Sequence, residues 1–262
     1  MGRSMAPNTY LDRGFIVMVY IFDAAPVSLR TDLSGALNRA HKRLGQTGDW
    51  LNGEQRRAVV AETRHSWDCH LCQVRKLEPS PYSVSGEHQT FGNLPASWLN
   101  VIHRVATDPG RLSKRWFQEA LSSGLEEDEF IEIVSVCVQA LALDVFSTAI
   151  GMDLPPLPAA KAGDPLRCRP PGAKTGPGWV ATIGPKDAGP DFLDFYANDS
   201  HFYIRRSMTL VQQETRRLWD LLNHLYLEDP RLFELEGLDR GISRAQMEFL
   251  AARASSLLGC YY

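Results

Sequence analysis

The sequence predicts an all-α protein, and three observations lead to that prediction. Apolar residues recur three and four positions apart over several stretches, which is the spacing of one face of an α-helix. Acidic residues precede the longest apolar stretch and a glycine follows it, as at the two ends of a helix. Alternating β-branched residues, which would indicate strands, are confined to a short N-terminal segment.

The apolar spacing predicts a series of helices along the chain. They are expected at residues 32–44, 54–65, 95–106, 114–122, 208–227 and 243–258. The last two have the amphipathic pattern, for example at Leu218, Leu221, Leu222 and Leu225.

A further helix is expected between residues 125 and 151. Glutamates and an aspartate occupy its first turn, and Gly151 follows its last turn as a left-handed cap. Its apolar residues lie on several faces, so we expect it at the centre of the fold. Glu132, Gln139 and Asp144 would be costly in hydrocarbon, which argues against a membrane span.

Length and charge limit the class of protein. With 262 residues, the chain is long enough for one large or two ordinary domains. The net charge of −3, with basic residues scattered along the chain, argues against a nucleic-acid partner. The apolar segment 14–22 is too short to cross a bilayer, and we expect a buried strand or short segment there. We therefore expect a soluble, cytoplasmic protein with no membrane partner.

A proline- and glycine-rich segment divides the chain. Residues 153–190 contain 9 of the 16 prolines, a composition that resists regular structure and suits a connector. The predicted organisation is a helical domain over 1–152, a linker over 153–190 and a second helical domain over 191–262.

The residues with the clearest chemistry are Cys69 and Cys72, in the sequence Cys69-His70-Leu71-Cys72. Two cysteines at this spacing at a helix start can alternate between dithiol and disulfide, and the helix N-terminus favours the thiolate. Arg75 and Lys76 add positive potential. A single C-x-x-C among five cysteines is more typical of a working thiol pair in a reducing compartment than of a disulfide scaffold.

Metal binding and a purely structural role are the alternatives for this motif. His65, Cys69, Cys72 and His88 would supply the two sulfurs and two nitrogens of a structural zinc site, although their spacing differs from that of common zinc fingers. Cys137 is expected to be a buried apolar residue and Cys168 an exposed thiol. His103 and His201 have no partner at catalytic spacing in the sequence, so we expect structural or surface roles for them.

The chain end repeats the pattern of the first motif. Residues 51–71 align with 242–262, which places Cys69 on Cys260, and Glu248 precedes Cys260 by twelve positions. This spacing resembles the E-x11-C-x-x-C-x3-H motif of the alkylhydroperoxidase D and carboxymuconolactone decarboxylase superfamily. Residues 116–134 also resemble a helix of that family, and the likeness covers most of 50–158 and 200–262. A branch with two repeats, the alkylhydroperoxidase-related (seleno)proteins, is the most similar.

The resemblance implies an all-α fold of two helical repeats and a cytoplasmic homo-oligomer. It also implies an antioxidant oxidoreductase, a peroxidase that reduces small hydroperoxides with electrons from a dithiol donor and without a cofactor. Carried over to this chain, Cys72 would attack the peroxide and Cys69 would resolve the product as a redox-active disulfide. Glu248 and Cys260 would be the corresponding catalytic residues of the second repeat.

Two departures from the family pattern affect these expectations. Arg57 and Lys76 stand at the acid–base positions of the first repeat, so the proton relay of the family is missing there. The second repeat is truncated after its first motif cysteine, because the sequence ends at Tyr262, one residue before the second is due. A selenocysteine after Tyr262 would explain that end, and a cut or degenerate repeat is the alternative.

Two classes of function therefore stay open. One is a peroxide-reducing thiol or selenol oxidoreductase. The other is a non-catalytic helical module with a structural zinc site or a structural C-x-x-C, whose partner is another protein.

Overall fold

The computed structural model describes residues 21–196 and 203–260, and the regular secondary structure in these ranges is helical. It contains no strand in these ranges, and the sole β-type pairing there is an isolated bridge between Lys174 and Thr182. The predicted all-α class is confirmed, while the two-repeat organisation stays a prediction. Most of the apolar segment 14–22 lies outside the described residues; its end enters a short 3-10 helix, Ile21–Ala24, in which Phe22 is buried.

The predicted helices are present, with ends that differ by a few residues. Their bounds are Thr31–Leu44 (α1), Gly53–His65 (α2), Ala96–Thr107 (α4), Lys114–Ser122 (α5), Glu127–Ala149 (α6), Gln212–Leu225 (α8) and Arg244–Leu258 (α9). The helix expected to start at the cysteine pair is His70–Leu77 (α3), and one short helix, Tyr203–Arg206 (α7), was not predicted. Local chemistry sets several ends: Asn52 and Gln55 form a capping box at the start of α2, which satisfies two backbone N–H groups there.

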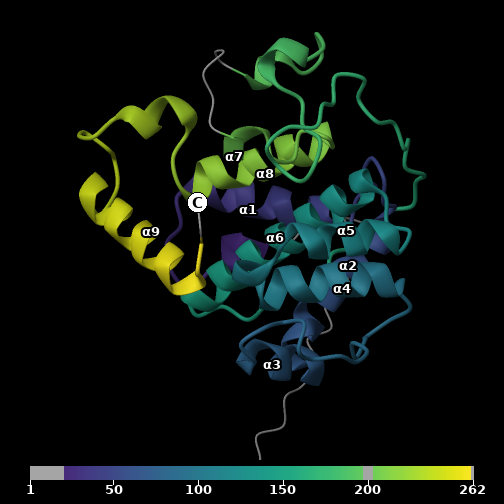
Figure 1. Cartoon of the computed structure of the whole chain (residues 1–262). Coiled ribbons are helices and arrows are strands. Elements are labelled where there is room, and N and C mark those ends of the chain that lie inside the picture. Colours follow the sequence, from purple (N-terminus) through teal and green to yellow (C-terminus); the bar gives the residue numbers. More distant parts are fainter. Residues whose placement is uncertain (1–20, 197–202, 261–262) are drawn as a thin grey trace, which may run out of the picture.

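Helix α6 is the centre of the molecule, as predicted. Helices α1, α2, α4 and α8 pack around it (Figure 1). Among the described residues it is the one helix long and apolar enough to cross a membrane, and most of that apolar stretch is buried inside the protein. Its all-round hydrophobicity is therefore that of a core helix surrounded by other helices.

The 153–190 segment has little regular structure, as its composition predicts, and it lies against the helices. Lys161 N–H donates to the Gly45 carbonyl at 2.8 Å, and Arg169 pairs with the Glu127 carboxylate. Beyond this segment, α8 packs against both α1 and α6. The division into two domains stays a prediction, but the helices on either side of the segment are in contact.

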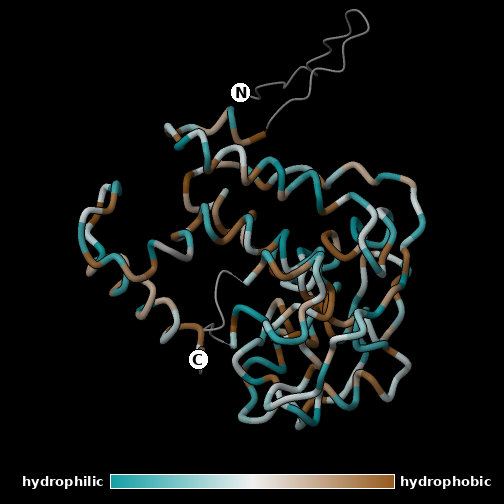
Figure 2. Tube along the Cα trace, turned by 90° about the horizontal axis from the view of Figure 1, so that it is seen from above, coloured by the Kyte–Doolittle hydropathy of each residue, from teal (hydrophilic) through white to brown (hydrophobic). Residues whose placement is uncertain are grey.

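Helix α9 differs from the others because none of its residues is buried. Its exposed apolar residues include Phe249, Leu250, Leu257 and Leu258. Figure 1 shows α9 at the edge of the molecule, and Figure 2 shows hydrophobic positions along the segment that leads to the C-terminus.

Candidate functional site

Cys69 and Cys72 lie at the start of α3, where the sequence places them. Cys69 is the N-cap residue with an extended backbone, and its carbonyl accepts the first helical hydrogen bond from Gln73 N–H at 3.1 Å. Both cysteines are buried, together with Leu71 and against Val84. His70, between them, points to solvent. The short turn therefore brings both sulfur atoms to the inner side of α3.

Two histidines complete a cluster that we call the Cys–His centre: Cys69, Cys72, His88 and His103. His88 comes from the irregular stretch between α3 and α4, and His103 comes from α4. His103 Nδ1 is 3.3 Å from Cys72 Sγ, and His88 Nδ1 is 3.5 Å from the same sulfur and 3.7 Å from Cys69 Sγ. The four potential ligand atoms all lie within 4.8 Å of one another.

A buried carboxylate orients one of these histidines. Glu62, on α2, lies with Oε1 2.8 Å from His103 Nε2, and its Oε2 accepts from Phe91 N–H and the Thr90 hydroxyl. Because an ionised carboxylate can only accept, it holds the imidazole proton on Nε2. The Nδ1 atom of His103 is then left with its lone pair directed at the sulfur atoms.

Burial determines the protonation of the Cys–His centre. It raises the pKa of the Cys72 thiol to about 12, and the neighbouring Cys69 adds to the rise. It lowers the pKa of His88 to about 3, with further lowering from His103 and Arg75. At neutral pH, without a bound cation, Cys72 is therefore a thiol and His88 a neutral imidazole. The expected thiolate at the helix start is opposed, because the largest influence on Cys72 is desolvation.

The structure gives two histidines surroundings that the sequence did not show. His103 was expected to be structural or on the surface without a partner; it is buried and faces Cys72 and Glu62. His65, expected as a zinc ligand, is not in the Cys–His centre and has its ring 6.1 Å from that of Phe91. The sequence offers only a weak signal for the burial of His103, namely its place in an apolar helical stretch beside Val101 and Ile102, which are also buried. His201 lies outside the described residues.

The acid–base partners of Cys72 also differ from the family pattern. Arg57, at the position of the family's glutamate, is exposed on α2, and Lys76 is exposed on α3. The carboxylate that reaches the centre is Glu62, one and a third turns after Arg57 on the same helix, and it acts through His103. An imidazole–carboxylate pair is therefore present beside Cys72, although the motif spacing predicted none.

The candidate residues of the second repeat lie elsewhere. Glu248 is on α9, where it pairs with Arg244 at 2.8 Å and accepts from the Tyr226 hydroxyl. Cys260 is exposed just beyond the end of α9. No hydrogen bond or ion pair in the described part of the chain joins either residue to Cys69 or Cys72. The selenocysteine after Tyr262 concerns a position outside the printed sequence and stays a prediction.

The remaining cysteines are placed as expected. Cys137 is buried on α6, and Cys168 is exposed in the 153–190 segment. Comparison with known protein families, with curated proteins and with solved structures finds no match to this chain. The resemblance to the alkylhydroperoxidase superfamily therefore stays a prediction, and the geometry of the Cys–His centre is the basis for a functional proposal.

Proposed function

We propose that this chain is a zinc protein in which the Cys–His centre holds one structural Zn²⁺. The observation that carries the proposal is the convergence of two sulfur and two imidazole nitrogen atoms within 4.8 Å of one another in a buried place. Four protein ligands of this kind match the closed tetrahedral sites that zinc occupies when its role is structural. No open coordination position is then left for a substrate.

The surroundings of the centre fit a metal. Glu62 accepts from His103 Nε2, which is the carboxylate–histidine arrangement that commonly supports zinc ligands. A cation also offsets the cost of ionising the buried Cys72 thiol. One contact must change: Arg75 Nη1 lies 3.5 Å from His88 Nε2, which carries a proton when Nδ1 binds the metal. This distance is at the limit of a hydrogen bond, so its loss costs little.

Such a metal would have a clear structural task. The stretch between α3 and α4, residues 78–95, has no regular secondary structure and contributes His88. A zinc ion would join this stretch to the start of α3 and to α4. It would thereby stabilise a part of the protein that buries few apolar side chains of its own.

Metal analysis of the purified protein tests the proposal. We expect one zinc per chain after purification without chelators, and loss of zinc in Cys72→Ser. Cys168→Ser is the matched control, because that cysteine is exposed and outside the centre; it should keep its zinc. A chain without zinc, or a Cys72→Ser variant that retains it, would contradict the proposal.

A second candidate is a cytoplasmic thiol peroxidase, favoured by the line of contacts from Cys72 through His103 to Glu62. In this function His103 takes the Cys72 proton and the thiolate attacks a small hydroperoxide. The O–O bond breaks, an alcohol leaves, and Cys72 becomes a sulfenic acid. The Cys69 thiol then displaces water to form a disulfide, which a dithiol donor reduces. The homo-oligomer that the family resemblance implies is proposed only together with this peroxidase function.

Zinc occupancy separates the two candidates. If the metal is structural, chelation lowers the melting temperature and peroxide turnover stays at background with or without zinc. If the protein is a peroxidase, the zinc-free form stays folded, consumes peroxide with dithiothreitol, and yields a Cys69–Cys72 disulfide detectable by mass spectrometry. His103→Gln should then slow the turnover by removing the base.

A further inference from the structure

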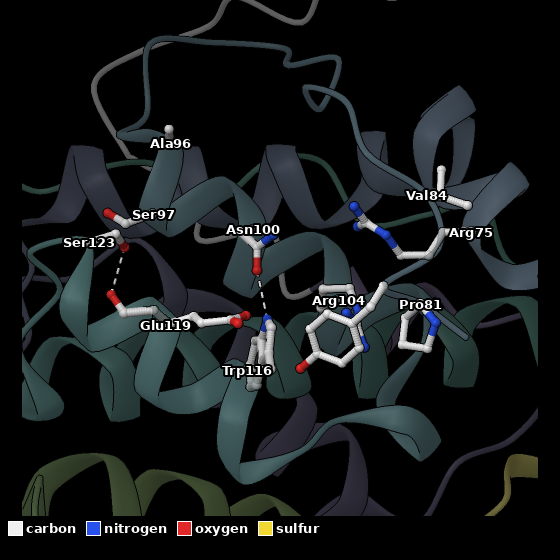
Figure 3. Close-up of a pocket in the computed structure, with 12 residues that line it drawn as sticks. Arg75, Pro81, Val84, Ala96, Ser97, Asn100, Arg104, Trp116, Glu119 and Ser123 are labelled. Atoms are coloured by element: carbon white, nitrogen blue, oxygen red, sulfur yellow. Dashed lines mark hydrogen bonds between the residues drawn. The ribbon is translucent and has the colours of Figure 1, made fainter.

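A cavity of about 380 Å³ lies beside the Cys–His centre, between α3, α4 and α5. The residues that give it chemical character are Arg75, Tyr82, Asn100, Arg104, Trp116 and Glu119. Figure 3 shows Arg75 and Arg104 on one side of it and Trp116 and Glu119 toward the other. Arg75 and Val84 line the cavity and also contact the centre: Arg75 Nη1 lies 3.5 Å from His88 Nε2, and Val84 packs against the two cysteines.

The two arginines of this cavity are buried with less negative charge around them than their own positive charge. Arg75 is 7% exposed and Arg104 is 3% exposed, and the Nε atoms of both have no hydrogen-bond partner. No salt bridge among the described residues involves Arg75. Arg104 has Asp108 at 3.6 Å, but that carboxylate also pairs with Arg111, at 2.8 Å. Buried charges are normally paired, but here Arg75 has no carboxylate partner and Arg104 shares its carboxylate with Arg111.

The acidic residue of the cavity does not supply that anion. Glu119 pairs with Arg115 at 2.7 Å on the exposed side of α5. The contact of Arg75 with His88 does not neutralise its charge either, because imidazole is neutral there. If zinc occupies the Cys–His centre, as proposed above, His88 Nε2 carries a proton and Arg75 loses this acceptor too.

The opposite wall of the cavity is aromatic and apolar. The Trp116 indole N–H donates to Asn100 Oδ1 at 2.6 Å, which leaves the amide NH₂ of Asn100 as a further donor. Arg104 lies 6.0 Å from the centroid of the Trp116 ring. Ala96 and Ala120 also line the cavity. Its volume is at the lower end of the range of ligand pockets, which restricts the ligand to a small molecule.

We propose that this cavity binds a small organic carboxylate. The carboxylate would accept from Arg75 and Arg104, whose planar groups suit a two-oxygen acceptor, and the apolar body would lie against Trp116. Inorganic phosphate shares the oxyanion chemistry but would leave the aromatic and apolar wall uncovered. Binding of the carboxylate requires no metal ion, so it can be tested independently of zinc.

Titration calorimetry with benzoate on the protein as purified tests this inference. We expect saturable binding of benzoate, with binding of inorganic phosphate and of neutral benzyl alcohol at least about tenfold weaker, since each lacks one half of the recognition. Absence of saturable benzoate binding would overturn the proposal. Equal or tighter binding of phosphate would overturn the assignment to a carboxylate, and equal binding of benzyl alcohol would overturn the role of the arginines.

Variants locate the binding in the cavity. Arg75→Gln should weaken benzoate binding about tenfold or more by removing a charge-assisted hydrogen bond, whereas Arg57→Gln, an exposed arginine on α2, should leave it unchanged. Because Arg75 also touches His88, Ser97→Trp is the second variant: it lines the cavity, carries no charge and should block entry. Zinc content and melting temperature check each fold. Unchanged benzoate affinity in a folded Ser97→Trp protein would overturn the site.

Discussion

Two polar clusters are buried in this protein, and they differ in the kind of groups that they bring together. The first, which we call the ion cluster, comprises Arg56, Glu132, Glu214 and Arg217. The second is the Cys–His centre. Both draw their members from at least three elements and bring them together in a place that excludes water. The ion cluster pairs charged side chains with one another, whereas the Cys–His centre gathers thiol and imidazole groups, the ligands that zinc prefers.

The contacts of the ion cluster show what balance achieves. Arg56 Nη1 lies 2.6 Å from a Glu132 oxygen and 2.8 Å from a Glu214 oxygen, and these three side chains are completely buried. Ser135 donates to Glu214, and Trp50 N–H donates to Glu132. Two positive and two negative side chains pair with one another, although Arg56 Nε has no hydrogen-bond partner, and the ion pairs join α2, α6 and α8. Both clusters are buried, so burial alone does not distinguish them. Paired opposite charges indicate a cluster that stabilises the fold by itself, whereas converging thiol and imidazole groups indicate a ligand site.

The largest expected effect comes from breaking the balanced cluster. Arg56→Met leaves two carboxylates buried without their central cation, and we expect it to cost about 3–5 kcal/mol of unfolding free energy. Urea denaturation measures the loss. The matched control is Arg57→Met, next to it but exposed, which should change stability by less than about 0.5 kcal/mol. Similar losses of unfolding free energy in the two variants would show that the ion cluster does not stabilise the fold.

The corresponding change beside the Cys–His centre should alter metal affinity. Glu62→Gln removes the carboxylate that orients His103, and we expect zinc affinity to fall by about 10–100-fold. Competition with a chromogenic chelator gives the value. Glu54→Gln, on the exposed face of the same helix, is the control and should leave the affinity unchanged. Unaltered affinity in the Glu62 variant would mean that this carboxylate does not support a metal ligand.

A dependence on pH should follow from the ion cluster. Burial by itself raises the pKa of Glu214, but the charges of Arg56 and Arg217 outweigh this effect and hold that pKa below its usual value. A carboxylate with a lowered folded pKa contributes stability above its unfolded pKa, and that contribution is lost as pH falls through the folded pKa. The carboxyl carbon shift of Glu214, followed by NMR, should therefore titrate below the usual range for glutamate. A midpoint above that range would contradict the charge balance described here.

The smallest effect is expected at α9. Glu248 is exposed and its partner Arg244 lies on the same helix, so Glu248→Gln should change unfolding free energy by less than about 0.5 kcal/mol. Zinc content should stay the same as well. A loss of zinc or of peroxide turnover in this variant would link α9 to the Cys–His centre, and would favour the two-repeat interpretation.

Sequence reasoning succeeded where the determinants are local. The helices at 114–122 and 54–65 follow from apolar spacing, and their observed ends differ from the expected ones by no more than a residue. Cys69 and Cys72 are three positions apart, so one turn at a helix start suffices to bring them together. Exposure of Cys168 and burial of Cys137 follow in the same way from the character of their neighbours.

It failed where distant residues meet. His103 is 31 positions from Cys72 and 41 from Glu62, and neither interval carries a pattern that indicates contact. The ion cluster spans 158 positions from Arg56 to Glu214. Such groups are paired by the packing of one helix on another, which depends on the complete set of side chains at each interface.

The sequence by itself determined an all-helical chain, its central helix and a pair of neighbouring cysteines, because helix periodicity, end caps and short turns act within a few residues. Only the tertiary structure decided which histidines and carboxylate surround those cysteines, and which buried arginines lack a carboxylate of their own. Those outcomes depend on which helices pack together and on how far burial excludes water from their charged groups.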